Sequence, residues 1–300
     1  MTLKITTLIE DTKKDDSLIN EFGLSMHIES KGVNILLDTG TTGQFLKNTS
    51  RLGIDPRDID MVVLSHGHFD HGGGLGAMLD ANTACKTYMH KDAPGAYYGN
   101  IGAKLPAAVN FFVHPLIKHA MKVSRYIGLD PAVLKKHHNR IQYISSTQEI
   151  AENIFLITDI SRNYPVPAGN KFLLSLENGT LKEDDFRHEI ILVIKEEDGM
   201  IIFTGCCHNG ILNMIETVRR QFKDQPIKAV IGGFHLKLQP MKDDMAGTKN
   251  EVKNIATELI RQRVEKVFTG HCTGNKAYAV LGSVLQERLE PIYTGSSIRI

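Results

Sequence analysis

Histidines and an aspartate are concentrated in one short loop of the chain. The segment Ser65–His71 reads SHGHFDH, and three glycines follow it. Side chains two apart in an extended segment point the same way, so His66 and His68 can meet at one point. Asp70 and His71, adjacent at the following turn, can face a second point nearby. The loop therefore predicts one or two divalent metal sites. Zn²⁺ suits these nitrogen and carboxylate ligands, as do Mn²⁺, Fe²⁺, Co²⁺ and Ni²⁺.

One loop cannot complete the coordination of two ions, so further ligands are expected where other strands end. Three later segments each contain an apolar run, then small residues, then a histidine: His208, His235 and His271. We predict that His208 and His271 bind metal. His235 is the predicted proton donor or acceptor, because the ordinary pKa of histidine is close to neutral.

Strands and helices alternate around these residues. The patterns of apolar side chains before the loop predict strands at 4–9, 24–29, 33–37 and 60–65. Those after the loop predict strands at 189–195, 200–204, 227–231 and 266–269, and helices after Gly210 and at 251–263. This order favours a layered α/β fold, with two facing sheets inside and helices outside. We expect one domain over residues 1–300.

Residues from about 92 to 145 interrupt this alternation. The segment has helix-like stretches, four prolines and more basic than acidic side chains, and we expect a mostly helical insertion over one rim of the fold. Its cations and aromatic rings suit a small anionic substrate that carries a ring. Lys122 and Arg125 are the predicted substrate contacts. The alternative is a set of amphipathic helices with ordinary solvated lysines and core aromatics.

Composition narrows the classes of function. A formal net charge of +1 over 300 residues argues against a general nucleic-acid binder. No segment approaches the roughly 20 apolar residues that span a bilayer, and the N-terminus lacks the pattern of a signal peptide. We therefore expect a cytoplasmic protein without membrane contacts. The four cysteines suit a reducing compartment.

Four segments resemble, in order, motifs of the metallo-β-lactamase superfamily: Leu36–Gly40, the histidine loop, Phe203–Cys206 and Thr269–His271. The resemblance implies a four-layer αββα sandwich with metal ligands gathered at one edge where the two sheets meet. Many members have an aspartate that bridges both metals at the position of Cys206. A thiolate can bind metal, so Cys206 is also a predicted ligand, but it puts a carboxylate-bridged pair of metals in doubt.

The resemblance also assigns these residues to two metal sites. His66 and His68 match ligands of one metal, and Asp70, His71 and His271 match ligands of the other. His188 lies at about the family's usual distance for the third histidine of the first metal and is the alternative to His208, which its strand-end setting favours. Asp70 is also an expected catalytic residue. Asp38 matches a carboxylate that orients a ligand histidine from the second shell.

A narrower resemblance points to a substrate class. The segments Gly23–Ser25, Thr204–His208, Gly232–Leu236 and His271–Gly274 resemble the 7,8-dihydropterin-6-ylmethyl-4-(β-D-ribofuranosyl)aminobenzene 5'-phosphate synthases and their relatives. This implies a metal-dependent transfer or hydrolysis at a phosphorylated or pyrophosphorylated substrate. A generic ester or phosphoester hydrolase remains an alternative, and so does a metal or ligand sensor without catalysis.

Overall fold

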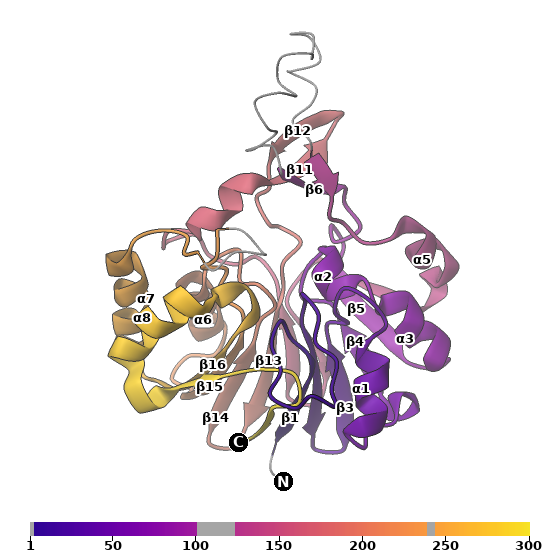
Figure 1. The fold of residues 1–300 in the computed structure, drawn as a ribbon, viewed down its shortest axis with the longest axis horizontal. Helices are drawn as coiled ribbons and strands as arrows, with labels where there is room; N and C mark the ends of the chain where they lie inside the picture. The colour runs from indigo at the N-terminus through magenta and orange to yellow at the C-terminus, as the bar shows by residue number, and fades with distance from the viewer. Residues whose placement is uncertain (1–2, 101–123, 239–243) are drawn as a thin grey trace.

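Two seven-stranded sheets form the centre of the molecule (Figure 1). The structure is a computed structural model, and it describes residues 3–100, 124–238 and 244–300. The first sheet has the order β18-β1-β2-β3-β4-β5-β8. Its strands are β1 (Lys4–Ile9), β2 (Ser25–Ser30), β3 (Val33–Leu37), β4 (Met61–Val63), β5 (Lys86–His90), β8 (Ile141–Ile144) and β18 (Ser297–Arg299). The strand predictions before the loop are confirmed, with ends that shift by up to two residues.

The second sheet has the order β17-β16-β15-β14-β13-β10-β9. Its strands are β9 (Gln148–Ala151), β10 (Ile154–Ile157), β13 (Ile191–Glu196), β14 (Gly199–Phe203), β15 (Ile227–Gly232), β16 (Val264–Thr269) and β17 (Leu289–Pro291). One buried cluster contains Ile28 and Ile35 of the first sheet and Leu192, Ile201 and Ile231 of the second. The sheets therefore face each other across a shared apolar core.

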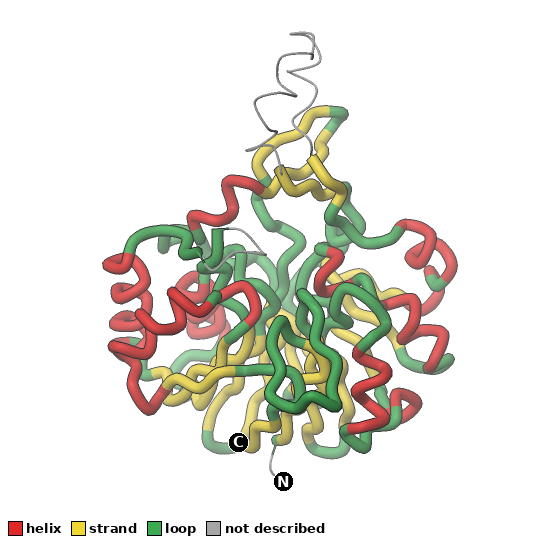
Figure 2. Tube along the Cα trace, in the orientation of Figure 1, coloured by secondary structure: helices red, strands yellow, loops and turns green. Residues whose placement is uncertain are grey.

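Helices cover the outer faces of both sheets (Figure 2). The first sheet carries α1 (Phe45–Arg51) and α3 (Leu75–Ala81), and the second carries α6 (Ile211–Gln221), α7 (Lys249–Arg261) and α8 (Asn275–Leu285). Each outer layer buries its own apolar cluster. The predicted αββα sandwich is confirmed. Within the described ranges, no helix is long and apolar enough to cross a membrane.

A third sheet projects from the edge of the sandwich (Figure 1). It contains β6 (Tyr97–Asn100), β7 (Ser124–Tyr126), β11 (Leu173–Glu177) and β12 (Thr180–Glu183) in the order β12-β11-β6-β7.

The described parts of the segment 92–145 contain strands as well as helix, whereas the sequence predicts a mostly helical insertion. Besides β6, β7 and β8 the segment contains one short helix, α5 (Pro131–Lys136), and a 3₁₀ turn, while 101–123 lie outside the described residues. The difference has a tertiary cause, because Tyr98 pairs with Leu174 of a strand that is remote in sequence. Local patterns do not report such a partner.

Candidate metal centre

Parallel strands bring the predicted site residues to one edge of the sandwich. β14, β15 and β16 pair in parallel, so the residues that follow them emerge together. The histidine loop follows β4 and reaches this edge from the facing sheet. Gly205 lies where the two meet, since a Cβ on it would be 2.0 Å from Ser65 Oγ. Only glycine permits this close approach.

His66, His68 and His208 form a first cluster, in which their ligand atoms all lie within 4.8 Å of one another. Nε2 of His66 is 3.1 Å from Nδ1 of His68. Two nitrogens that each lie about 2.1 Å from one tetrahedral ion are about 3.4 Å apart, so this spacing is close to that of metal ligands. Nε2 of His208 is buried and has no hydrogen-bond partner among the described residues. An orphaned buried nitrogen of this kind fits a site for a divalent transition metal.

Hydrogen bonds determine which ring nitrogens of this cluster face inward. Ser65 Oγ donates to Asp38 Oδ2 at 2.7 Å and so accepts from Nδ1 of His66 at 2.9 Å. His208 Nδ1 donates to Asn170 Oδ1 at 3.1 Å. Both rings therefore present the lone pair of Nε2.

The pKa values of the first cluster agree with metal ligation. Burial and the neighbouring histidines lower the pKa of His68 to about 3. The same two causes hold the pKa of His66 and of His208 well below the ordinary value. All three rings are neutral at physiological pH, which is the form that binds metal.

Asp70, His71, Cys206 and His271 form a second cluster. Cys206 Sγ lies 3.1 Å from Nε2 of His71 and 3.4 Å from Nε2 of His271. Asp70 Oδ2 is 3.7 Å from Nε2 of His71 and 3.5 Å from Nε2 of His271. The thiol thus lies close to both histidines of this cluster, at the position where the resemblance implies a bridging aspartate.

The second cluster attracts positive charge. Burial alone would lower the pKa of His71, but the carboxylates of Asp38 and Asp70 raise it above its ordinary value. The pKa of His271 is raised in the same way, against burial, chiefly by Asp11. Burial raises the pKa of the Cys206 thiol, and a cation among these ligands would offset that effect by stabilising the thiolate.

Two carboxylates hold the histidines of the second cluster from behind. Asp38 is fully buried, and its Oδ2 lies 2.7 Å from Nδ1 of His71, in the orienting position expected for it. Asp11, which the sequence patterns did not single out, places Oδ1 2.7 Å from Nδ1 of His271. Glu10 accepts the backbone N–H of His271. The sequence does contain a signal for these two acids, because they come directly after β1, just as the ligand histidines come shortly after other strands.

Replacing Asp11 by alanine should weaken binding at the second cluster alone. His271 would lose the acceptor that fixes its tautomer, a loss that typically costs 10–100-fold in metal affinity. Competition with a chelating indicator measures this affinity. Asp15→Ala, an exposed acid of the same loop, is the matched control. Equal affinities for the two variants would remove Asp11 from the site.

His188, the alternative ligand, has both ring nitrogens engaged. Nδ1 accepts the backbone N–H of Gly67 at 2.9 Å, and Nε2 donates to Asp184 Oδ2 at 3.0 Å. Its ring lies 4.0 Å from that of Tyr97. His188 therefore holds the backbone between the two loop histidines. His68, Asp184 and His188 also lie within ligand distance of one another, but the unpartnered Nε2 favours His208.

His235 lies at the edge of the first cluster. Its ring centroid is 4.2 Å from that of His208, and its Nδ1 is buried without a hydrogen-bond partner among the described residues. The backbone N–H of His235 donates to Cys272 Sγ at 3.2 Å. Cys207 points into the core, where its Sγ contacts Met214.

Arg125 lies beside the histidine loop. Its Cζ is 5.5 Å from the centroid of the Phe69 ring, and the backbone N–H of Phe69 donates to the carbonyl of Ile127 at 2.8 Å. This part of the segment 92–145 therefore lies against the site. Lys122, the other predicted substrate contact, lies outside the described residues.

Comparison with known proteins agrees with this geometry. The family model of the metallo-beta-lactamase superfamily matches residues 19–100. The chain is 31% identical over 307 residues to a protein of Methanocaldococcus jannaschii named 7,8-dihydropterin-6-methyl-4-(beta-D-ribofuranosyl)-aminobenzene-5'-phosphate synthase, covering 99% of this chain and 96% of that protein.

Solved structures share the fold. Tm1679, described as a metal-dependent hydrolase of the beta-lactamase superfamily, matches with a TM-score of 0.78 and 27% identity over 99% of both chains. Zn²⁺-bound PqqB from Methylobacterium extorquens has a TM-score of 0.58 at 11% identity, over 99% of this chain and 100% of that one, and shows the fold alone. The fold implies divalent metal ions, and the two clusters offer the ligands for them. This chain belongs to the metallo-β-lactamase superfamily.

Proposed function

We propose that this chain is an enzyme that binds two divalent transition-metal ions and acts at the phosphoryl or pyrophosphoryl group of a small substrate. One observation carries the proposal. Four histidines have Nδ1 beside an oxygen and direct Nε2 into one of the two clusters: His66, His71, His208 and His271. Four rings fixed in this way are typical of metal ligands with a supporting second shell.

The chain's own residues have distinct roles in this proposal. His66, His68 and His208 would hold one ion, and Asp70, His71, Cys206 and His271 the other. A bound pair of ions would supply Lewis-acid stabilisation of the negative charge on a phosphoryl or pyrophosphoryl oxygen. His235 Nδ1 is the group that would hold or release a proton beside the first cluster. The guanidinium of Arg125, at the rim, would attract the anionic substrate.

The relative with 31% identity supports a specific transfer reaction. We propose that the bond between the pterin methyl carbon and a pyrophosphate oxygen breaks, and that the aminobenzene substrate forms the new bond to that carbon. Pyrophosphate leaves with the electron pair, and the aminobenzene group loses a proton, for which His235 is the acceptor. Hydrolysis, in which water replaces the aminobenzene group, is the second candidate, and the similarity to the hydrolase Tm1679 supports it.

The two reactions are separated by their products. Protein loaded with Zn²⁺ or Mn²⁺ is incubated with 6-hydroxymethyl-7,8-dihydropterin pyrophosphate, with and without the aminobenzene ribofuranosyl phosphate. Transfer predicts pyrophosphate release that depends on the second substrate, with a coupled product in the mass spectrum. Hydrolysis predicts release without it. Binding without turnover, at the level of a His71→Ala control, would instead indicate a sensor.

Cys206 should determine how tightly the second ion binds. Cys206→Ser is expected to lower the affinity for that ion by roughly tenfold or more, because an alcohol is a poorer ligand than a thiolate for these metals. It should also reduce the sensitivity of activity to peroxide, while Cys206→Asp should retain both ions. Metal analysis after dialysis and residual activity after peroxide treatment measure these effects. Cys85→Ser, at a buried thiol outside the clusters, is the control. Unchanged metal content and peroxide sensitivity in Cys206→Ser would contradict this role.

A further inference from the structure

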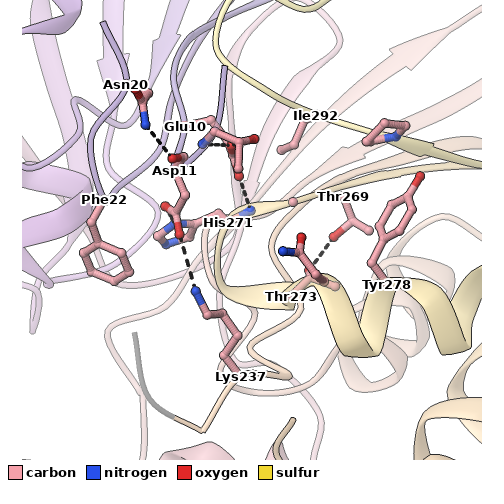
Figure 3. Close-up of a pocket in the computed structure, with 15 residues that line it drawn as sticks. Glu10, Asp11, Asn20, Phe22, Lys237, Thr269, His271, Thr273, Tyr278 and Ile292 are labelled. Atoms are coloured by element: carbon pink, nitrogen blue, oxygen red, sulfur yellow. Dashed lines mark hydrogen bonds and ion pairs between the residues drawn. The ribbon is translucent and has the colours of Figure 1, made fainter. Parts of the chain in front are cut away.

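A pocket of about 580 Å³ adjoins the second cluster (Figure 3). Its walls come from segments far apart in the sequence: the residues after β1, the residues after β16, the first turns of α8 and the end of β17. His271 belongs both to this wall and to the second cluster. The pocket lies on the Nδ1 side of His271, beside Asp11, while Nε2 of the same ring faces the second cluster. One imidazole ring therefore separates a molecule bound here from the proposed metal centre.

Phe22 connects the pocket to the histidine loop. Its ring centroid is 5.2 Å from that of His271 and 6.4 Å from that of Phe69. Arg125 Cζ lies over the Phe69 ring, 5.5 Å from its centroid. One substrate could thus have its charged group near the loop and another part in the pocket.

The charges of the pocket disfavour a phosphate. Glu10 and Asp11 supply two carboxylates to its wall, and Lys237 supplies one ammonium group. Nζ of Lys237 is 3.7 Å from Asp11 Oδ2, so its positive charge is matched within the wall. A phosphate placed here would meet carboxylates at close range. The charge of the pocket thus differs from that beside the histidine loop, where Arg125 supplies a cation.

The remaining lining suits a flat ring that makes hydrogen bonds. Phe22 and Tyr278 lie on opposite sides of the carboxylates in Figure 3, and their ring faces can cover an aromatic guest. Asn20 and Asn275 add amides that both donate and accept. Among the carboxylate oxygens, Glu10 Oε1 and Oε2 and Asp11 Oδ1 already accept hydrogen bonds within the protein, whereas Asp11 Oδ2, 3.7 Å from Lys237 Nζ, can accept one from a guest N–H donor.

We propose that this pocket binds the uncharged, amino-substituted heteroaromatic ring of the substrate, while the phosphoryl or pyrophosphoryl group is held at the metal centre. The assignment of the reacting group rests on the proposed function, whereas the assignment of the ring rests on the lining of the pocket. A pterin ring, with its amino group and ring N–H, has the required chemistry.

The test uses a probe without phosphate, 6-hydroxymethyl-7,8-dihydropterin, whose binding to the metal-loaded protein is measured by calorimetry. Asn275→Leu and Tyr278→Ala should each weaken binding by about tenfold, as expected for the loss of one hydrogen bond or one aromatic wall. Asn254→Leu, at an exposed position on α7, should bind as the wild type does. Thermal melts of all the variants establish that each is folded.

Turnover provides the second readout. The two pocket variants should raise KM for the pterin pyrophosphate by a similar factor and leave cleavage of a phosphoester without a ring unchanged. Equal binding of the probe by Asn275→Leu, Tyr278→Ala and the wild type would overturn the pocket assignment, even if the wild type turns over the pyrophosphate. Probe binding that the variants weaken, in a wild type without any turnover, would instead contradict the proposed function and leave the pocket assignment standing.

Discussion

Replacing His68 by alanine should remove one of two bound metal ions and lower turnover by about 10³-fold, because two ions together contribute several kcal/mol to stabilising charge in the reaction. His271→Ala should remove the other ion with a similar loss. The two residues belong to different clusters, so each variant is expected to retain about one ion per chain. Plasma mass spectrometry of protein purified without chelators measures the metal, and kcat/KM measures the loss.

His138→Ala is the control for these variants, since His138 is an exposed histidine on a 3₁₀ turn. It should keep both ions and full activity. Loss of both ions in either single variant would mean that the clusters are one cooperative site. Full occupancy in both variants would mean that the ligands are elsewhere.

Asp38→Ala should have the largest effect on stability among these variants. Asp38 is fully buried and accepts the backbone N–H and the hydroxyl of Ser65, at 2.8 and 2.7 Å, as well as Nδ1–H of His71. Each buried donor left without an acceptor costs roughly 1–3 kcal/mol, so we expect the free energy of unfolding to fall by about 3 kcal/mol or more. Metal affinity at the second cluster should fall about 10–100-fold as well.

Denaturant unfolding of chelator-treated protein separates the first effect from the loss of metal. Asp58→Ala, an exposed acid on the first sheet's side of the molecule, should change the free energy of unfolding by less than about 0.5 kcal/mol. If Asp38→Ala matched Asp58→Ala in unfolding, the hydrogen bonds around Asp38 would not stabilise the fold as described.

Much of the fold could be predicted from apolar patterns because the strands are short, regular and buried. The predicted strand 227–231 and helix 251–263 correspond to β15 and α7, with ends that differ by one or two residues. The histidines could be found for a related reason. Each follows a recognisable strand, and parallel strands end at the same edge of a sheet.

Other features depend on contacts between remote residues, which no local pattern reports. Asp11 and His271 are 260 positions apart, and the backbone between them determines that their side chains meet. The strands of the projecting sheet likewise depend on pairing between β6 and β11. Both ring nitrogens of His188 are hydrogen-bonded to groups that only the folded chain brings near it. The sequence alone therefore could not decide whether His188 or His208 is the metal ligand.

The most direct test of the central claim is anomalous X-ray diffraction from crystals of metal-loaded protein, collected on both sides of the absorption edge of the bound metal. We predict two peaks in the anomalous difference map, one among His66, His68 and His208, and the other among Asp70, His71, Cys206 and His271. A peak among His68, Asp184 and His188 instead of the first would assign the ligand role to His188. A map without a peak in either cluster would contradict the account.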